Sequence, residues 1–86
     1  MKLVFEPIAW EQFLFWQETD KATLSKINGL IKECLRHPFE GTGKPEPLKG
    51  DLAGFCSRRI DREHRLVYRV TDTAVDIVRC RYHYAP

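Results

Sequence analysis

At 86 residues the chain has the length of one domain, which we expect to span residues 1–86. Hydrophobic residues make up 43% and charged residues 30%, which excludes a disordered chain, and no apolar run approaches the length needed to span a bilayer. The formal net charge of +2 is too small to indicate an anionic partner by itself. Because the first residues turn polar too early for a secretory signal, the expected location is the cytoplasm and no membrane contact is expected.

The N-terminal half predicts a strand followed by two helices. Residues 1–5 form a short apolar segment, and Pro7 indicates a helix start because proline is tolerated at the first helical position. Apolar residues then recur at helical spacing from Ile8 to about Thr19. Asp20 offers a cap for a second helix, which ends before Pro38 because a residue preceding proline avoids helical geometry. We expect the two helices to form an antiparallel hairpin.

Residues 38–50 (PFEGTGKPEPLKG) predict a loop. This segment holds three prolines and three glycines in thirteen residues, so it is neither a regular helix nor a central strand. Pro45 and Pro47 bracket Glu46 and restrict its backbone. That arrangement suits a side chain that has to be held at a fixed place.

The remainder of the chain shows a period of two and predicts three strands. They cover residues 55–60, 65–70 and 75–84, with turns at 61–64 and 71–74. The expected fold is therefore α+β, with an N-terminal strand and a two-helix antiparallel hairpin packed on a twisted, mainly antiparallel sheet.

The basic residues gather in this C-terminal half. Residues 44–86 carry nine Lys/Arg against six Asp/Glu. Because alternate residues of a strand share a face, the last strand is expected to present Arg79, Arg81 and His83 on one face and to bury Val78 and Cys80 on the other. Arg65 and Arg69 share a face of the preceding strand in the same way. Such a basic face binds an anion or is an ordinary solvated face, and the pattern alone leaves both open.

The same residue types fit the cleavage of RNA by its own 2′-OH. That reaction needs a base near the hydroxyl, an acid near the leaving 5′-oxygen and positive charge at the phosphate. Glu46, His83 and Arg65 offer these groups, and no metal ion is required. By contrast, His64 lies in a predicted turn and is expected to be a surface residue.

The cysteines and carboxylates indicate no metal site, no disulfide and no cofactor. Cys34, Cys56 and Cys80 are odd in number and widely spaced, without a C-x-x-C pair. We expect three reduced and mostly buried thiols. The carboxylates form no cluster that predicts a bound metal ion.

Longer strings identify a family. They are WQETDK at 16–21, PFEG at 38–41, GKPEPLK at 43–49, SRRI at 57–60, EHRLVY at 63–68 and CRYHY at 80–84. With this spacing they closely resemble the YoeB toxins of the RelE superfamily, essentially from end to end. Two departures are the Cys56 that follows Phe55 where the family pattern has tryptophan, and the Ala85-Pro86 extension beyond the usual terminal tyrosine.

The resemblance implies a RelE-like microbial RNase fold and a toxin of a type II toxin–antitoxin system. Such toxins are ribosome-dependent endoribonucleases that cleave mRNA in the ribosomal A site and inhibit translation. They form homodimers, and a YefM-like antitoxin neutralises them. The pair represses its own operon, with operator DNA contacted only through the antitoxin complex.

Carried over by position, the resemblance assigns Glu46 as general base, His83 as general acid and Arg65 as the group that stabilises the transition state. The residues implied in RNA or phosphate binding are Lys49, Arg59, Arg81 and Tyr84. Two alternatives remain, a non-cleaving relative of the ParE type that inhibits DNA gyrase, and a repressor component that only binds RNA or a partner. The presence of Glu46, Arg65 and His83 together favours the nuclease, since a gyrase inhibitor has no need of an acid–base pair.

Overall fold

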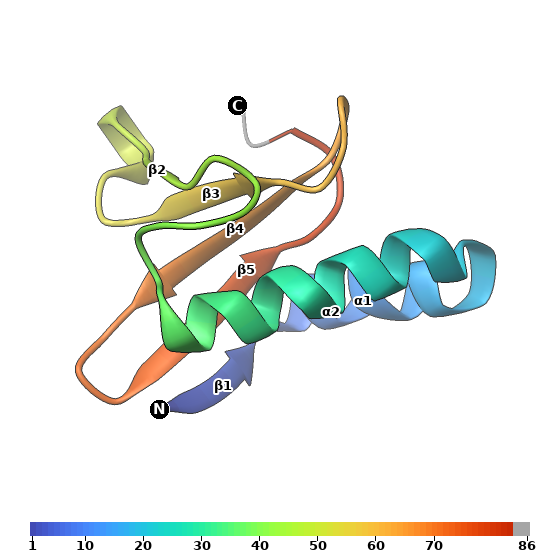
Figure 1. The fold of residues 1–86 in the computed structure, drawn as a ribbon, viewed down its shortest axis with the longest axis horizontal. Coiled ribbons are helices and arrows are strands. Elements are labelled where there is room, and N and C mark those ends of the chain that lie inside the picture. The colour runs from blue at the N-terminus through green and yellow to red at the C-terminus, as the bar shows by residue number, and fades with distance from the viewer. Residues whose placement is uncertain (84–86) are drawn as a thin grey trace.

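The computed structural model describes residues 1–83 of the chain and contains one mixed sheet with two helices on one face (Figure 1). In chain order the elements are β1 (Lys2–Phe5), α1 (Pro7–Thr19), α2 (Lys21–Arg36), β2 (Glu46–Pro47), the short 3-10 helix η1 (Gly50–Leu52), β3 (Cys56–Arg59), β4 (Arg65–Val70) and β5 (Ala74–Arg79). The five strands follow the order β1-β5-β4-β3-β2. Only β1 runs parallel to its neighbour, β5, so the expected α+β fold with a mainly antiparallel sheet is confirmed.

A single residue ends one helix and begins the next. The Asp20 N–H donates to the Trp16 carbonyl at the end of α1, and its carboxylate accepts from the Thr23 N–H at 3.0 Å and the Thr23 hydroxyl at 2.8 Å. These bonds satisfy donors that the first turn of α2 leaves unpaired, and they hold the pKa of Asp20 below its usual range. The predicted cap is confirmed, and it makes the hairpin of α1 and α2 tight.

The helices bury the inner face of the sheet. Leu66 and Tyr68 of β4 and Val75 and Ile77 of β5 are fully buried against α1 and α2. Apolar residues of α2 at helical spacing complete this core, namely Ile27, Leu30, Ile31 and Cys34. The opposite, outer face of β2 to β5 therefore carries the alternate residues of each strand. Within residues 1–83 no helix has the length and apolar character needed to cross a membrane.

The last strand is shorter than expected. The prediction of a strand to residue 84 is wrong, because β5 ends at Arg79 after a shift of register. Tyr68 pairs with Ile77 while its neighbour Val67 pairs with Arg79, so Val78 is an extra residue in β5. This step reverses the alternation, and Val78 is half-buried rather than part of the inner face.

Candidate active site

One row of residues crosses the outer face of the sheet. Glu46 of β2 pairs with Ser57 of β3, Ser57 with Val67 of β4, and Val67 with Arg79 of β5. Residues directly opposite each other on antiparallel strands point to the same side. Ser57 and Val67 are each 2% exposed, whereas Glu46 and Arg79 are exposed. The row therefore has a buried centre, with an exposed carboxylate at one end and an exposed guanidinium at the other.

Two arginines lie one pleat further along the same face. Arg59 at the end of β3 is directly opposite Arg65 at the start of β4. Arg59 is exposed, and Arg65 is half-buried because its guanidinium turns toward the β3–β4 turn and donates to the Asp61 carbonyl at 2.9 Å and the His64 carbonyl at 3.0 Å. This pair concentrates positive charge next to the row that contains Glu46.

Arg69 does not add to that charge. It shares the face of Arg65, as predicted, but its guanidinium is bound to the Asp76 carboxylate at 2.9 Å and lies over the Phe55 ring. The ion pair largely neutralises this end of the face. Arg69 therefore does not contribute to an anion-binding group with Arg65.

The loop that leads to Glu46 is held by a buried arginine that the sequence analysis missed. Arg58 is fully buried on the inner face, and its guanidinium donates to the carbonyls of His37, Glu40 and Thr42. The Tyr68 hydroxyl accepts from Arg58 Nε at 3.3 Å and donates to the Pro38 carbonyl at 2.6 Å. Burial raises the pKa of Tyr68 to about 12, so its hydroxyl stays protonated as that bond requires. The signal was present in the SRRI string, since two adjacent arginines in a strand cannot both face solvent.

A carboxylate completes the attachment of this loop. Glu33 of α2 accepts from the Thr42 N–H at 2.6 Å and lies 3.4 Å from the Arg58 guanidinium. The Thr42 bond, and after it the charge of Arg58, hold the pKa of Glu33 below its usual range. Gly41 is required beside it, because its φ of +113° favours glycine and a Cβ there would lie 1.7 Å from Glu33 Oε1. The loop is thus bound at both ends before it reaches Pro45-Glu46-Pro47.

The segment after β5 turns back onto α1 before it reaches His83. The Cys80 N–H donates to Gln12 Oε1, and the Cys80 carbonyl accepts from Trp16 Nε1, both at 2.8 Å. The Arg81 guanidinium lies 3.5 Å from the centre of the Phe15 ring. The expected common face of Arg79, Arg81 and His83 is therefore wrong, because α1 binds this backbone in place of a neighbouring strand. The prediction that Cys80 is buried is confirmed.

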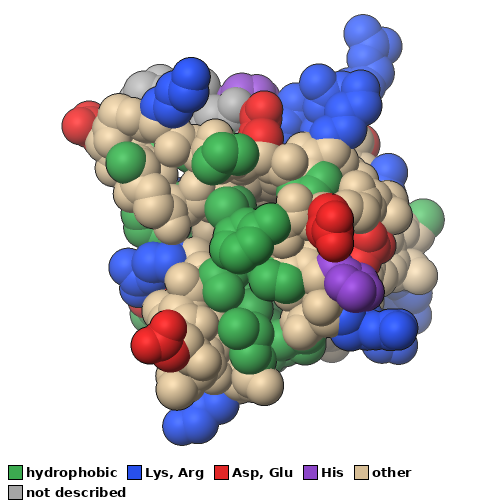
Figure 2. Space-filling model, turned by 60° about the vertical axis from the view of Figure 1, so that its left-hand side comes forward, with side chains coloured by type: hydrophobic (Ala, Val, Ile, Leu, Met, Phe, Trp, Pro, Cys, Tyr) green, Lys and Arg blue, Asp and Glu red, His purple; other side chains and the backbone are tan. Residues whose placement is uncertain are grey.

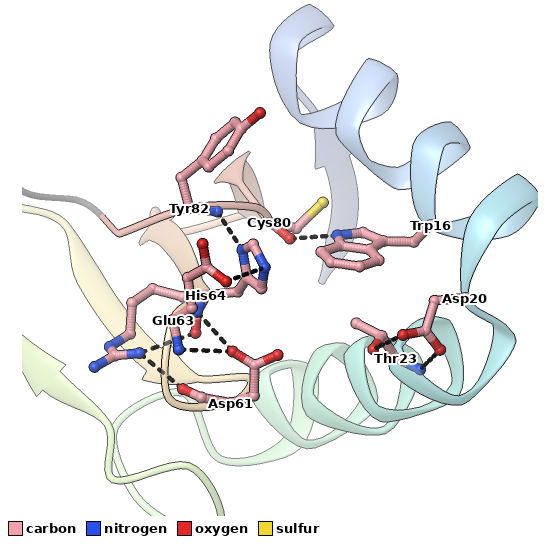
Figure 3. A network of polar contacts seen from close by, with 9 residues as sticks. Trp16, Asp20, Thr23, Asp61, Glu63, His64, Cys80 and Tyr82 are labelled. Carbon is pink, nitrogen blue, oxygen red and sulfur yellow. Dashed lines mark hydrogen bonds and ion pairs between the residues drawn. The ribbon is translucent and has the colours of Figure 1, made fainter.

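His83 follows a residue that is tied to the start of β4. The Tyr82 carbonyl accepts from the Arg65 N–H at 2.9 Å, so the peptide that leads to His83 lies beside Arg65. His83 itself is exposed. The Tyr82 N–H donates to the His64 side chain, which is only 11% exposed (Figure 3). The expectation that His64 is a surface residue is wrong, because the tail, which comprises residues 80–83 after β5, packs over it.

Two further predicted site residues are Lys49 and Tyr84. Lys49 is exposed at the start of η1, in the connection between β2 and β3. Tyr84 lies outside the described residues, and its role stays a prediction. Within residues 1–83, no three His, Cys, Asp or Glu side chains form a group able to hold a metal ion.

The three thiols are free and buried, as predicted. Burial raises the pKa of Cys34 to about 11 and that of Cys80 to about 12, and it also raises the pKa of Cys56. These groups are therefore neutral thiols at physiological pH. None has the lowered pKa of a reactive cysteine.

An apolar hollow lies beside β2, next to Glu46. It measures about 280 Å³ and is lined by Phe39, Pro45, Glu46, Pro47 and Cys56. Figure 2 turns this side of the molecule forward and shows apolar side chains gathered at the centre of the face, with charged side chains around them. Cys56, which stands where the resemblance expects tryptophan, forms part of its wall.

Comparison with known proteins identifies the family to which this chain belongs. The family model described as a YoeB-like toxin of bacterial type II toxin-antitoxin systems matches residues 5–84. The chain belongs to this family. The toxin YoeB of Escherichia coli strain K12 is 61% identical over 84 residues, which cover 98% of this chain and 100% of that relative.

Solved structures of YoeB proteins share the fold. A YoeB/ParE toxin from Agrobacterium tumefaciens has a TM-score of 0.95 at 52% identity, over 98% of this chain and 100% of that one. YoeB of Staphylococcus aureus, solved as a dimer and in a heterotetrameric complex with YefM, has TM-scores of 0.91 and 0.90 at 47% identity, over 98% of both chains. This YoeB-like chain is thus a toxin of a type II toxin–antitoxin system.

Proposed function

We propose that this YoeB-like toxin is a ribosome-dependent endoribonuclease that cleaves mRNA in the ribosomal A site without a metal ion and so inhibits translation. The observation that carries the proposal is the outer face of the sheet. There Glu46 lies on β2, Arg59 and Arg65 are opposed on β3 and β4, and the Tyr82 carbonyl just before His83 accepts from the Arg65 N–H. This arrangement supports the assignment of a base, positive charge and an acid to one phosphodiester.

The proposed reaction uses the RNA's own 2′-OH as nucleophile. The Glu46 carboxylate takes the proton of that hydroxyl while the 2′-oxygen forms a bond to phosphorus. The bond from phosphorus to the 5′-oxygen breaks, and His83 donates a proton to this leaving oxygen. The products are a 2′,3′-cyclic phosphate and a 5′-hydroxyl. Arg65 stabilises the negative charge that develops on the phosphoryl oxygens.

Further contacts to the RNA are assigned to the residues around this centre. Arg59 is exposed opposite Arg65, and Lys49 is exposed in the connection that follows β2, which supports the assignment of each to a flanking phosphate. Tyr84 directly follows His83 and is proposed to place the RNA. Arg81 is also assigned to RNA binding, and its guanidinium, which lies against Phe15, has to leave that ring to reach RNA.

The proposed partners follow from the relatives. Staphylococcus aureus YoeB forms a dimer and a complex with YefM, and we extend both properties to this chain. The toxin would act in the cytoplasm, where ribosomes are found, and would reach operator DNA only through its antitoxin complex. Co-purification with a YefM-like antitoxin, and light scattering of the free toxin, test the complex and the homodimer separately.

The activity is tested by primer extension on mRNA in a purified translation system, with wild type, Glu46→Gln and His83→Gln. Loss of a general base or acid costs about 10²–10⁴ in rate, so both variants are expected to lose the ribosome-dependent cuts. Glu18→Gln on α1 and His37→Gln after α2 are matched controls, because both side chains are exposed and lie away from the outer face. Both controls are expected to cleave like wild type.

Two results would overturn the proposal. A folded wild type that makes no cuts in the presence of ribosomes favours gyrase inhibition, which a supercoiling assay then tests. Binding of RNA or antitoxin that persists in Glu46→Gln and His83→Gln, with no cleavage by wild type, favours a repressor component that only binds.

A further inference from the structure

His64 joins the β3–β4 turn to the segment that carries His83. Its Nδ1 accepts a hydrogen bond from the Tyr82 N–H at 2.7 Å, and its ring packs edge-on against Trp16 with centroids 4.8 Å apart (Figure 3). With 11% of its side chain exposed, His64 is held between a helix and the tail. These contacts link parts of the chain that are distant in sequence.

The residue that His64 binds has an unfavourable backbone conformation. Tyr82 has a φ of +66°, in the left-handed region that residues other than glycine seldom adopt. Such a conformation persists only where its surroundings hold it on several sides. Here the Tyr82 N–H is bound by His64, and the Tyr82 carbonyl accepts from the Arg65 N–H at 2.9 Å.

We infer that His64 is a positioning residue for the proposed general acid, because its Nδ1 holds Tyr82 in the left-handed conformation that sets where His83 begins. This inference rests on the proposed function of His83. The φ angle of Tyr82 helps to set the direction of the chain after it. A change to an ordinary negative φ would send His83 away from Arg65, to whose strand the Tyr82 carbonyl is bound.

The turn is built to keep His64 in place. Asp61 Oδ1 accepts from the Glu63 N–H at 2.8 Å and the His64 N–H at 2.7 Å, and these bonds hold the pKa of Asp61 below its usual range against the effect of burial. Because Nδ1 accepts, the ring carries its proton on Nε2, which lies 3.5 Å from Glu63 Oε1. Orientation of a functional histidine by neighbouring backbone and side-chain groups is a common device.

The test compares His64→Asn with His64→Gln. Asparagine places its amide oxygen at the δ position, where it can accept from the Tyr82 N–H, whereas glutamine places the same group one bond further out. Both variants lose the ring contact with Trp16, so the difference between them reports the acceptor alone. His64→Phe is the complementary variant, because it keeps the ring but has no acceptor.

Two readouts are measured on the full chain, the steady-state rate of ribosome-dependent cleavage and the hydrogen exchange of the Tyr82 amide. We expect His64→Gln and His64→Phe to lower kcat by up to about 10²-fold, the cost of a small misplacement, with little change in KM. Their Tyr82 amide should exchange about tenfold faster, as expected for the loss of one net hydrogen bond. His64→Asn should stay within about threefold of wild type in both measurements.

The inference is overturned if His64→Phe keeps wild-type kcat and wild-type exchange at Tyr82. It is also overturned if Asn and Gln are equally impaired, since packing on Trp16 would then be the whole role of His64. If wild type itself does not cleave RNA, the proposed function fails. The exchange of the Tyr82 amide then still decides whether His64 holds the tail.

Discussion

Arg59 and Arg65 face each other directly across β3 and β4, so two like charges share one pleat of the sheet. Opposed like charges on neighbouring strands are destabilising, typically by about 0.2–1 kcal/mol. The pairing is therefore costly in the free protein. A bound anion between the two guanidinium groups would remove that cost.

Replacement of one of these arginines should change the response of the protein to anions. We expect inorganic phosphate, at constant ionic strength, to raise the Tm of wild type by binding to the folded state, and to raise that of Arg59→Gln by less than half as much. Without phosphate, Arg59→Gln should be the more stable protein by up to about 1 kcal/mol. Lys21→Gln removes an equal charge from an exposed position at the start of α2 and serves as the control. An equal response of all three proteins would show that no anion site exists between Arg59 and Arg65.

The buried contact of Arg58 with Tyr68 should be important for stability. Tyr68→Phe leaves Arg58 Nε and the Pro38 carbonyl without their partner, and we expect a loss of about 1–3 kcal/mol. For a domain of this size each kcal/mol lowers the Tm by roughly 4–8 °C. Arg58→Lys should be more destabilising, because one ammonium cannot reach all the carbonyls that the guanidinium binds.

Thermal unfolding followed by circular dichroism measures both changes. Tyr82→Phe is the matched control, since Tyr82 is 52% exposed. Because the loop held by Arg58 leads to Glu46, cleavage by Tyr68→Phe should also fall at temperatures well below its Tm. Full activity and an unchanged Tm would mean that the loop needs no anchor.

The free energy of unfolding should fall at acid pH as Glu33 becomes protonated. Its pKa is lowered in the folded protein by the Thr42 N–H and by Arg58, from an ordinary value of 4.5. A lowered folded-state pKa adds stability above the unfolded value, and this is lost as the pH falls through the folded value. Glu33→Gln should therefore be less stable than wild type at pH 7, and the difference should shrink as the pH falls below about 4.5.

Tm measured from pH 7 to pH 3 checks this expectation. Glu18→Gln, an exposed substitution of the same kind on α1, should keep the wild-type pH dependence. Parallel curves for wild type and Glu33→Gln would contradict the assigned role of the Thr42 bond.

The hollow beside β2 should accept a larger side chain at position 56. Cys56→Trp adds apolar surface that Phe39, Pro45 and Pro47 can bury, and we expect a gain of about 1–2 kcal/mol in the free energy of unfolding. Chemical denaturation measures it, with Cys56→Ala as the control that should lose stability. A less stable Cys56→Trp would mean that the hollow cannot widen to take the indole.

Elements whose signals are local could be predicted from the amino-acid sequence. Asp20 and Pro38 mark helix limits through bonds and clashes with residues a few positions away, and both limits agree with α1 and α2. The alternation of β4 likewise placed Arg65 on the face opposite Leu66, because successive side chains of a strand point to opposite faces of the sheet. The strings shared with the YoeB family identified the fold and the class of toxin.

Hydrogen bonds between segments that are distant in the sequence could not be predicted, because they depend on how the chain packs. The end of β5 depends on Gln12 and Trp16 of α1, which bind the backbone of Cys80. The interior position of Arg58 depends on carbonyls some twenty residues earlier, and the burial of His64 depends on Tyr82, 18 residues later. Such partners have no fixed spacing along the chain, because a buried polar group binds whichever partner the packing brings to it.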